Sequence, residues 1–258
     1  MNAEVLAGYK KLIYNKLGLN FSGDKDYLLE SKIERIIQRE KYNSVEEFFQ
    51  SLKSGDSESL ETLIKYVTTN HTFFFREKDH LDILVQLIKR QDQAHPVIWS
   101  AASSTGEEVY SIIISLLESN INNFLLIASD INSSVLKKMH EGVYHENRFH
   151  ETSLSIKNKY FKKIGDESYQ ILPHLRDYIC IKKLNLIDYM QFVSKFDYIF
   201  CRNVLIYFDN ETRNKVAKNL LNNLKKGGYL FLGHTETLLN TTEKIERSHN
   251  SVYRHLGE

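Results

Sequence analysis

Polar side chains follow four separate apolar stretches of this 258-residue sequence. Glu108 comes shortly after the first stretch and Asp130 ends the second, while Asn185 follows the third and Asn203 and Tyr207 follow the fourth. If each stretch is a parallel strand, the loops after the strands meet at one edge of an open α/β sheet. The spacing therefore predicts a single crevice lined with carboxylate, amide and phenol groups that can hydrogen-bond to a ligand.

The loop after the first apolar stretch is made of small residues. Val97–Trp99 are apolar and bulky, residues 100–105 are small, and an apolar stripe with helical spacing begins after Gly106. Small residues let a ligand approach the backbone closely, and Ser104 or Thr105 is the expected N-cap of the helix. A strand, a small-residue loop and a helix begin the nucleotide-binding part of a doubly wound sheet. An ordinary strand-to-helix turn has the same pattern, so this stretch alone leaves both interpretations open.

Asp130 lies 24 residues beyond Gly106, at the end of the second apolar stretch. An acidic residue about 20 residues past such a loop usually hydrogen-bonds the ribose hydroxyls of a bound nucleotide. Asp130 is also a suitable N-cap for the expected helix Ser133–Glu141, and the two roles are compatible. The motifs GxGxxG and GxxxxGK[ST] are both absent from the sequence. Few glycines and several acceptors suit a nucleoside without a pyrophosphate, and S-adenosylmethionine fits that description.

The pattern of the chain predicts two parts that position these residues. Residues 1–69 contain no proline and repeat apolar residues at helical spacing, which predicts an N-terminal helical domain. Residues 70–258 alternate strand and helix patterns, which predicts an α/β domain. A stretch at about 143–176 interrupts the alternation, and its hairpin pattern predicts a small antiparallel β insertion. The helix after the fourth strand is expected to end at 225–228, Lys-Lys-Gly-Gly.

The segment 68–76, with the sequence TTNHTFFFR, breaks the helical rhythm between the two parts. Ordinary packing explains its three phenylalanines. Asn70, Thr72 and Arg76 are candidates for ligand binding, because pockets concentrate where domains join.

Composition argues against several classes of protein. The formal net charge of +1 argues against a protein that coats nucleic acid or an anionic membrane. The apolar runs are far shorter than the ~18 residues of a membrane span, and the N-terminus has no apolar signal core. Cys180 and Cys201 form no CxxC pair, so we expect a cytoplasmic protein. His140, His145 and His150 match no common metal-binding spacing, and no metal is expected.

Five blocks of this sequence together closely resemble the CheR-type chemoreceptor methyltransferases. The blocks are WSAASSTGEEVYS, VTTNHTFFFRE, ASDI, FDYIFCRNVLIYFD and GGYLFLGHTE. The resemblance runs from about Tyr27 to the C-terminus with similar spacings. Many family members carry Gly-Cys where this chain has Ala102-Ser103, and small residues are kept there. The NPPY-like block of amino-directed nucleic-acid methyltransferases is missing, and Cys201–Val204 stand in its place.

The resemblance implies an enzyme that transfers a methyl group from S-adenosylmethionine to glutamate side chains of chemoreceptors, with S-adenosylhomocysteine as the product. It implies a Rossmann-like methyltransferase sheet with the N-terminal helical domain and the β insertion. By this similarity the residues that line the cofactor are Asn70, Thr72, Arg76, Glu108, Asp130, Asn185, Leu186, Arg202 and Asn203. Arg76 and Tyr207 are expected to orient the acceptor, because an ionised glutamate can attack the methyl group without a base.

The partner implied by the resemblance is the set of cytoplasmic methylation helices of chemoreceptors. Lys32, Arg35 and Arg39 share one edge of a predicted helix and are candidates for docking, although a solvated edge explains them almost equally well. Some family members also bind a pentapeptide at the receptor's C-terminal tail through a longer, glycine-rich loop. Here that loop is about Gly165–Glu167 with two acids, so no such tether is expected. Two alternatives stay open, namely a non-catalytic S-adenosylmethionine-binding signalling module and a methyltransferase that acts on another protein, a small molecule or RNA.

Overall fold

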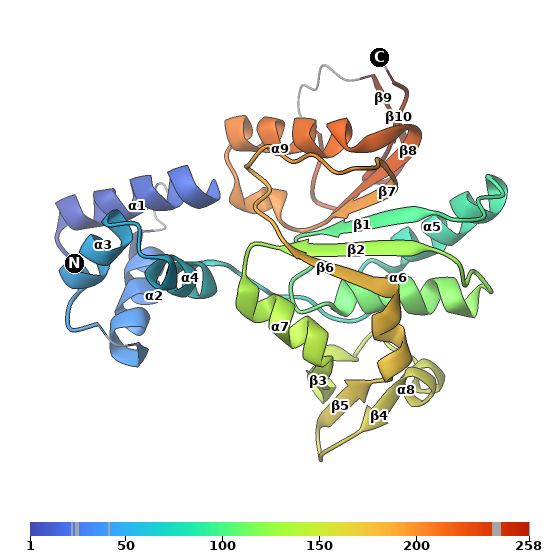
Figure 1. Cartoon of the computed structure of the whole chain (residues 1–258), viewed down its shortest axis with the longest axis horizontal. Coiled ribbons are helices and arrows are strands. Elements are labelled where there is room, and N and C mark those ends of the chain that lie inside the picture. The colour runs from blue at the N-terminus through green and yellow to red at the C-terminus, as the bar shows by residue number, and fades with distance from the viewer. Residues whose placement is uncertain (22, 24–25, 41, 239–243, 258) are drawn as a thin grey trace. The chain divides into compact units, whose positions relative to one another are not determined.

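The computed structural model describes residues 1–21, 23, 26–40, 42–238 and 244–257. The contacts between residues divide the chain into two compact units, residues 1–69 with 207–212, and residues 70–206 with 213–258. We call the first the helical unit and the second the sheet unit. Figure 1 labels the elements of each.

Helices build the described part of the helical unit. They are α1 (Ala3–Leu17), α2 (Asp26–Arg39), α3 (Val45–Lys53) and α4 (Ser57–Val67). Gly18 ends α1 with a φ of 71°, and the Ser44 side chain accepts the backbone N–H of Glu47 at the start of α3. The apolar stripes meet in a core that contains the fully buried Tyr9 and Phe48. The prediction of an N-terminal helical domain is therefore confirmed.

The described residues of the sheet unit form a seven-stranded sheet in the order β6, β2, β1, β7, β8, β10, β9. These strands are β1 (Val97–Ala101), β2 (Leu125–Asp130), β6 (Ile179–Lys183), β7 (Phe196–Cys201), β8 (Leu224–Leu232), β9 (Ile245–His249) and β10 (Val252–His255). The first five in this order run parallel, and β10 joins β8 antiparallel. The order reverses between β1 and β7, which is where open α/β sheets bind ligands. This topology confirms the predicted Rossmann-like fold class.

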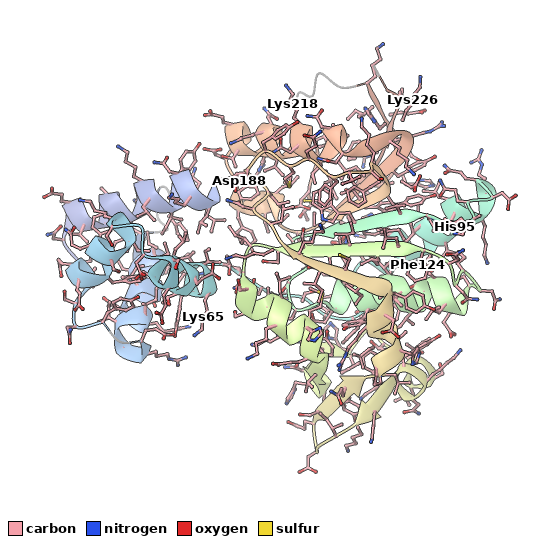
Figure 2. The ribbon with its side chains drawn as sticks, in the orientation of Figure 1. Lys65, His95, Phe124, Asp188, Lys218 and Lys226 are labelled. Atoms are coloured by element: carbon pink, nitrogen blue, oxygen red, sulfur yellow. The ribbon has the colours of Figure 1, made fainter. Side chains whose placement is uncertain are left out.

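Helices and buried aromatic residues stabilise this sheet. The helices are α5 (Lys78–Arg90), α6 (Glu107–Glu118), α7 (Ser133–Glu141) and α9 (Asn210–Asn222). Trp99 on β1 is fully buried, and its indole N–H donates to Ser129 Oγ on β2 at 2.9 Å. His95 and Phe124 mark the amino ends of β1 and β2, and Asp188 lies at the opposite end, beyond β6 (Figure 2). The predicted crevice loops leave the sheet at the Asp188 end.

The insertion is a small antiparallel sheet, as predicted, in the order β3, β5, β4 among the described residues. Its elements are β3 (Val143–His145), α8 (Leu154–Tyr160), β4 (Phe161–Lys163) and β5 (Ser168–Ile171). A 3-10 turn at Glu146–Arg148 lies between β3 and α8, and another at Pro173–Tyr178 follows β5. Figure 1 shows this sheet as a body separate from the large sheet, beside α8. The hairpin of β4 and β5 matches the sequence pattern. The third strand, β3, and the helix α8 were not predicted.

The predicted end of the last helix is wrong. Helix α9 ends at Asn222, and the residues expected to stop it, 225–228, belong to β8. Lys225 donates to both carboxylate oxygens of Asp197 on β7, each at 2.9 Å. Asn223 accepts the N–H of Phe196 through its carbonyl at 2.8 Å. Pairing with the neighbouring strand therefore determines the conformation of this basic, glycine-containing run.

Candidate cofactor and active site

The loop between β1 and α6 has an unusual backbone conformation. Ala102 and Ser104 have φ values of 59° and 50°, and Gly106 has 93°. Left-handed conformations are rare in residues other than glycine and cluster at functional sites. Gly106 itself is the N-cap of α6, without a side-chain hydrogen bond, so the prediction of Ser104 or Thr105 as the cap is wrong. A Cβ at Gly106 would collide with Met139 on α7, which explains why glycine occupies this position.

Asp130 joins this loop to the end of β2. Its carboxylate accepts the backbone N–H of Ser104 and that of Asn132, each at 2.9 Å. Asp130 is 7% exposed, and this burial raises the pKa of its carboxyl group. A carboxylate has about four acceptor positions, so lone pairs are left for the hydroxyls of a ribose. Asn132, and not Asp130, is the N-cap of α7, which removes the alternative role that the sequence allowed.

A buried ion-pair network links the loops after β1 and β7. The Glu108 carboxylate accepts the Ser100 hydroxyl at 2.7 Å, and its other oxygen lies 3.0 Å from Arg202 Nε. The Arg202 side chain is 3% exposed, and it donates to the backbone carbonyl of Arg76 at 2.5 Å. Burial raises the pKa of Glu108 although the Arg202 guanidinium opposes this effect. Three predicted cofactor residues, Arg76, Glu108 and Arg202, are thus brought together.

Glu77 is a member of this network that sequence reasoning did not single out. One of its carboxylate oxygens lies 3.6 Å from Arg202 Nε, and the other accepts Asn203 Nδ2 at 3.1 Å. Burial acts to raise the pKa of Glu77, but Arg202 and Asn203 hold it below its ordinary value. Glu77 and Asn203 both have left-handed backbones, with φ values of 52° and 58°. Its signals in the sequence were its position directly after Arg76 and its place as the last residue of the block VTTNHTFFFRE.

The predicted site residues Asn70, Thr72 and Arg76 lie on the segment that precedes α5. Thr72 is 9% exposed, and its carbonyl accepts Arg148 Nη1 at 2.5 Å. The carbonyl of Asn70 accepts the Ser104 hydroxyl at 3.3 Å, so the segment before Arg76 reaches the loop after β1. The Arg76 guanidinium lies over the Phe73 ring, 5.7 Å from its centre, and donates to the His71 carbonyl at 3.2 Å.

Asn185 and Leu186 follow β6, beside β2. Leu184 donates its N–H to the Asp130 carbonyl at 3.0 Å, which ties the start of this segment to the predicted ribose site. Leu186 is 7% exposed. Tyr207 belongs to the residues that group with the helical unit, and its carbonyl accepts the N–H of Asn20 at 3.2 Å. Hydrogen bonds therefore connect the segments that carry the predicted cofactor residues within the sheet unit. Tyr207 groups with the helical unit instead.

One cluster next to the network has the composition of a metal site. Glu77, His80 and His234 each bring one potential ligand atom within 4.8 Å of the others. However, Arg202 Nε lies 3.6 Å from the same Glu77 oxygen that faces His80 Nδ1 at 3.6 Å. A guanidinium at that distance repels a second cation, so we assign these residues to the ion-pair network.

Together the fold and the site define a class of protein. A parallel sheet that reverses order at β1, a small-residue loop with left-handed residues and a buried acid at the end of β2 suit a nucleoside cofactor. The phosphate-binding glycine motifs are absent from the sequence. These features are typical of S-adenosylmethionine-dependent methyltransferases.

Comparison with known proteins gives the family. The family model described as "CheR methyltransferase, SAM binding domain" matches residues 70–254, and "CheR methyltransferase, all-alpha domain" matches residues 6–68. The chain therefore belongs to the CheR methyltransferase family, as its sequence blocks predicted. Its cofactor is S-adenosylmethionine, and S-adenosylhomocysteine is the product.

Two relatives of similar sequence agree with this assignment. A chemotaxis protein methyltransferase of Borreliella burgdorferi is 39% identical over 243 residues, which cover 88% of this chain and 86% of the relative. Chemotaxis protein methyltransferase 2 of Vibrio cholerae is 32% identical over 242 residues, which cover 89% of this chain and 84% of the relative. Among solved structures, magnesium protoporphyrin IX methyltransferase of Synechocystis PCC 6803 with bound SAH is 13% identical with a TM-score of 0.36, covering 79% of this chain and 65% of that chain.

No helix in the described part of the chain is long and apolar enough to span a membrane.

Proposed function

We propose that this enzyme methylates glutamate side chains on the cytoplasmic helices of chemotaxis receptors. Membership of the CheR family and the names of its relatives as chemotaxis protein methyltransferases support this proposal. The enzyme then acts in the cytoplasm, where those receptor helices lie. The observation that carries the cofactor side of the proposal is the Asp130 carboxylate, which is buried and shared between the loops after β1 and β2.

Methyl transfer to glutamate does not need a general base from the protein. A glutamate with an ordinary pKa near 4.3 is already an anion at neutral pH. Its oxygen attacks the methyl carbon of the cofactor, the new O–C bond forms as the C–S bond breaks, and the sulfur keeps the bonding pair. The protein contributes in-line positioning and exclusion of water. A positive charge that bound the attacking carboxylate too tightly would lower its nucleophilicity.

We propose that Arg76 and Tyr207 orient this acceptor carboxylate. The Arg76 guanidinium lies over Phe73 and donates to the His71 carbonyl, so residues of its own segment set its direction. Residues Asn70, Thr72, Arg76, Glu108, Asp130, Asn185, Leu186, Arg202 and Asn203 are proposed to line the cofactor. No metal is required for this reaction.

Two variants test the acceptor side of the proposal. Arg76→Ala and Tyr207→Phe should lower kcat on receptor membranes by roughly 10-fold or more while the affinity for S-adenosylhomocysteine changes less. Thermal melts on the same samples separate this result from simple loss of fold. If the wild-type chain binds the cofactor but methylates no receptor, the signalling-module alternative replaces this proposal. Transfer to RNA, but not to receptors, would contradict it as well.

For docking, we propose that the basic edge of α2 contacts the glutamate-rich receptor helix. Arg35 and Arg39 are exposed. Lys32 differs from them, because its ammonium group donates to the Val67 carbonyl at 2.7 Å at the end of α4. Burial lowers the pKa of Lys32. Charge steering is therefore assigned chiefly to the two arginines.

A further inference from the structure

A buried glutamate at the end of β8 holds the loop after β7. Glu236 is 4% exposed. One oxygen of its carboxylate accepts the backbone N–H groups of Asn203 and Gly233, each at 2.7 Å, and the other accepts the N–H of Leu205 at 2.8 Å. A carboxylate that accepts three backbone N–H groups forms strong, charge-assisted hydrogen bonds. Three peptide groups from the ends of two adjacent parallel strands are thus fixed to one side chain.

Steric fit at Gly233 supports the same arrangement independently. A Cβ at this position would collide with Asn203 Nδ2 and would lie 2.8 Å from Glu236 Oε2 and 3.0 Å from Asn203 N. The two loops therefore approach each other more closely than a residue with a side chain permits. The loop that carries Glu236 is also anchored, because the Ser251 hydroxyl donates to the carbonyls of His234 and Glu236, each at 3.3 Å.

The segment held by Glu236 contains residues assigned to the cofactor. Asn203 takes a left-handed conformation with a φ of 58°, which costs free energy unless its surroundings hold it. Its N–H binds Glu236 while its side chain reaches Glu77 at 3.1 Å. Arg202, the preceding residue, pairs with Glu108. The direction of both side chains depends on the backbone that Glu236 fixes.

We propose that Glu236 is a positioning residue for methyl transfer: it fixes the 203–205 backbone so that Arg202 and Asn203 are preorganised for the cofactor. This inference rests on the proposed cofactor site and assigns a role to a side chain outside it. Glu236→Gln keeps the shape of the side chain but replaces one acceptor oxygen with an NH₂ group, so at least one backbone N–H loses its partner. Gly233→Ala disturbs the same loop by a steric route and keeps the carboxylate.

Asp197 provides a matched control at the opposite end of the sheet. It is 9% exposed, accepts the backbone N–H of Val97 at 2.9 Å and pairs with Lys225, so Asp197→Asn also replaces a buried carboxylate that binds a peptide group. We expect Glu236→Gln and Gly233→Ala to weaken S-adenosylhomocysteine binding by roughly 10-fold when measured by calorimetry on the full chain. Asp197→Asn should lower Tm but keep the affinity within about twofold.

The outcomes separate positioning from general stability. Faster amide hydrogen exchange at Asn203 and Leu205 should accompany the weaker binding in Glu236→Gln, with no such change in Asp197→Asn. Unchanged affinity in the folded Glu236→Gln protein, or equal weakening in Asp197→Asn, overturns the positioning role alone. A wild-type chain that binds no S-adenosylhomocysteine contradicts the proposed cofactor site, and the positioning role falls with it.

Discussion

The Asp130 carboxylate accepts the backbone N–H of Ser104 at 2.9 Å, and this bond fastens the end of β2 to the loop after β1. Ser104 has a left-handed φ of 50°, which is unfavourable for a residue with a side chain. The hydrogen bond offsets part of that cost because it forms only when the Ser104 N–H points at β2. The loop is therefore preorganised for a ligand, and binding needs little further ordering.

Asp130→Asn tests this relationship. The amide keeps the size of the side chain but presents an NH₂ group to a backbone N–H or to a ribose hydroxyl. Because a hydrogen bond to a charged group contributes about 1.5–3 kcal/mol, the affinity for S-adenosylhomocysteine should fall at least ~10-fold. Calorimetry gives the affinity, and circular dichroism checks that the fold persists. Unchanged affinity in a folded variant would remove Asp130 from the cofactor site.

The sheet and its central loop were predictable because their signals are local. Val97–Trp99, the small residues after them and the helical stripe of α6 form one continuous stretch of sequence, and the structure has the expected strand, loop and helix there. Asp130 was found by its spacing. The caps expected for α6 and α7 were wrong, because Gly106 and Asn132 occupy those positions. A Cβ at Gly106 would collide with Met139 on α7, and no local pattern reports such a contact with another helix.

The ion-pair network and the Glu236 contacts were not predictable for the same reason. Glu77 and Asn203 are 126 residues apart, and Glu236 and Asn203 are 33 apart. A single sequence has no signal that joins such pairs. At Lys225 a local signal misled the prediction. The helix-stop pattern at 225–228 was overridden because Lys225 pairs with Asp197 on the neighbouring strand.

The stability of the protein should depend on pH through His80. This residue is fully buried, and its Nε2 lies 3.1 Å from the Asn250 carbonyl. Burial lowers the pKa of its imidazole, and Arg202 lowers it further. The unfolded chain, with a His pKa near 6.5, binds the proton first as the pH falls. Stability from this group is thus complete above about pH 6.5 and is lost as the pH drops toward the folded-state pKa.

Urea unfolding between about pH 5 and pH 7 measures this effect. One proton contributes a slope of at most about 1.4 kcal/mol per pH unit. His80→Gln can still donate to Asn250, and it should flatten the wild-type slope by part of that amount. The exposed His95→Gln is the control and should keep the wild-type slope. Equal slopes in all three proteins would show that His80 does not titrate in this way.

The basic edge of α2 should affect receptor binding without affecting the cofactor. Arg35→Ala with Arg39→Ala should raise the KM for receptor membranes several-fold and weaken its dependence on salt, because the steering charges are lost. The affinity for S-adenosylhomocysteine should stay unchanged. Lys32→Ala should instead lower Tm, since it removes the donor to Val67. A receptor KM that is equal in wild type and in the double variant would place docking elsewhere.

The insertion should bind a receptor tail peptide only weakly. Its β4–β5 turn is short, since Ile164 donates its N–H to the Ser168 carbonyl at 2.9 Å, and Glu167 pairs with His145 on β3 at 2.8 Å. The edges of β3 and β4 can still accept an added strand in principle. However, Asp166 and Glu167 repel a peptide that ends in a carboxylate and carries an acidic side chain.

We expect no micromolar binding when such a pentapeptide is titrated into the wild-type protein by calorimetry. Asp166→Asn with Glu167→Gln should strengthen any residual binding, because the repulsion is removed. Micromolar binding to the wild type would contradict this prediction and make the tether a second docking site.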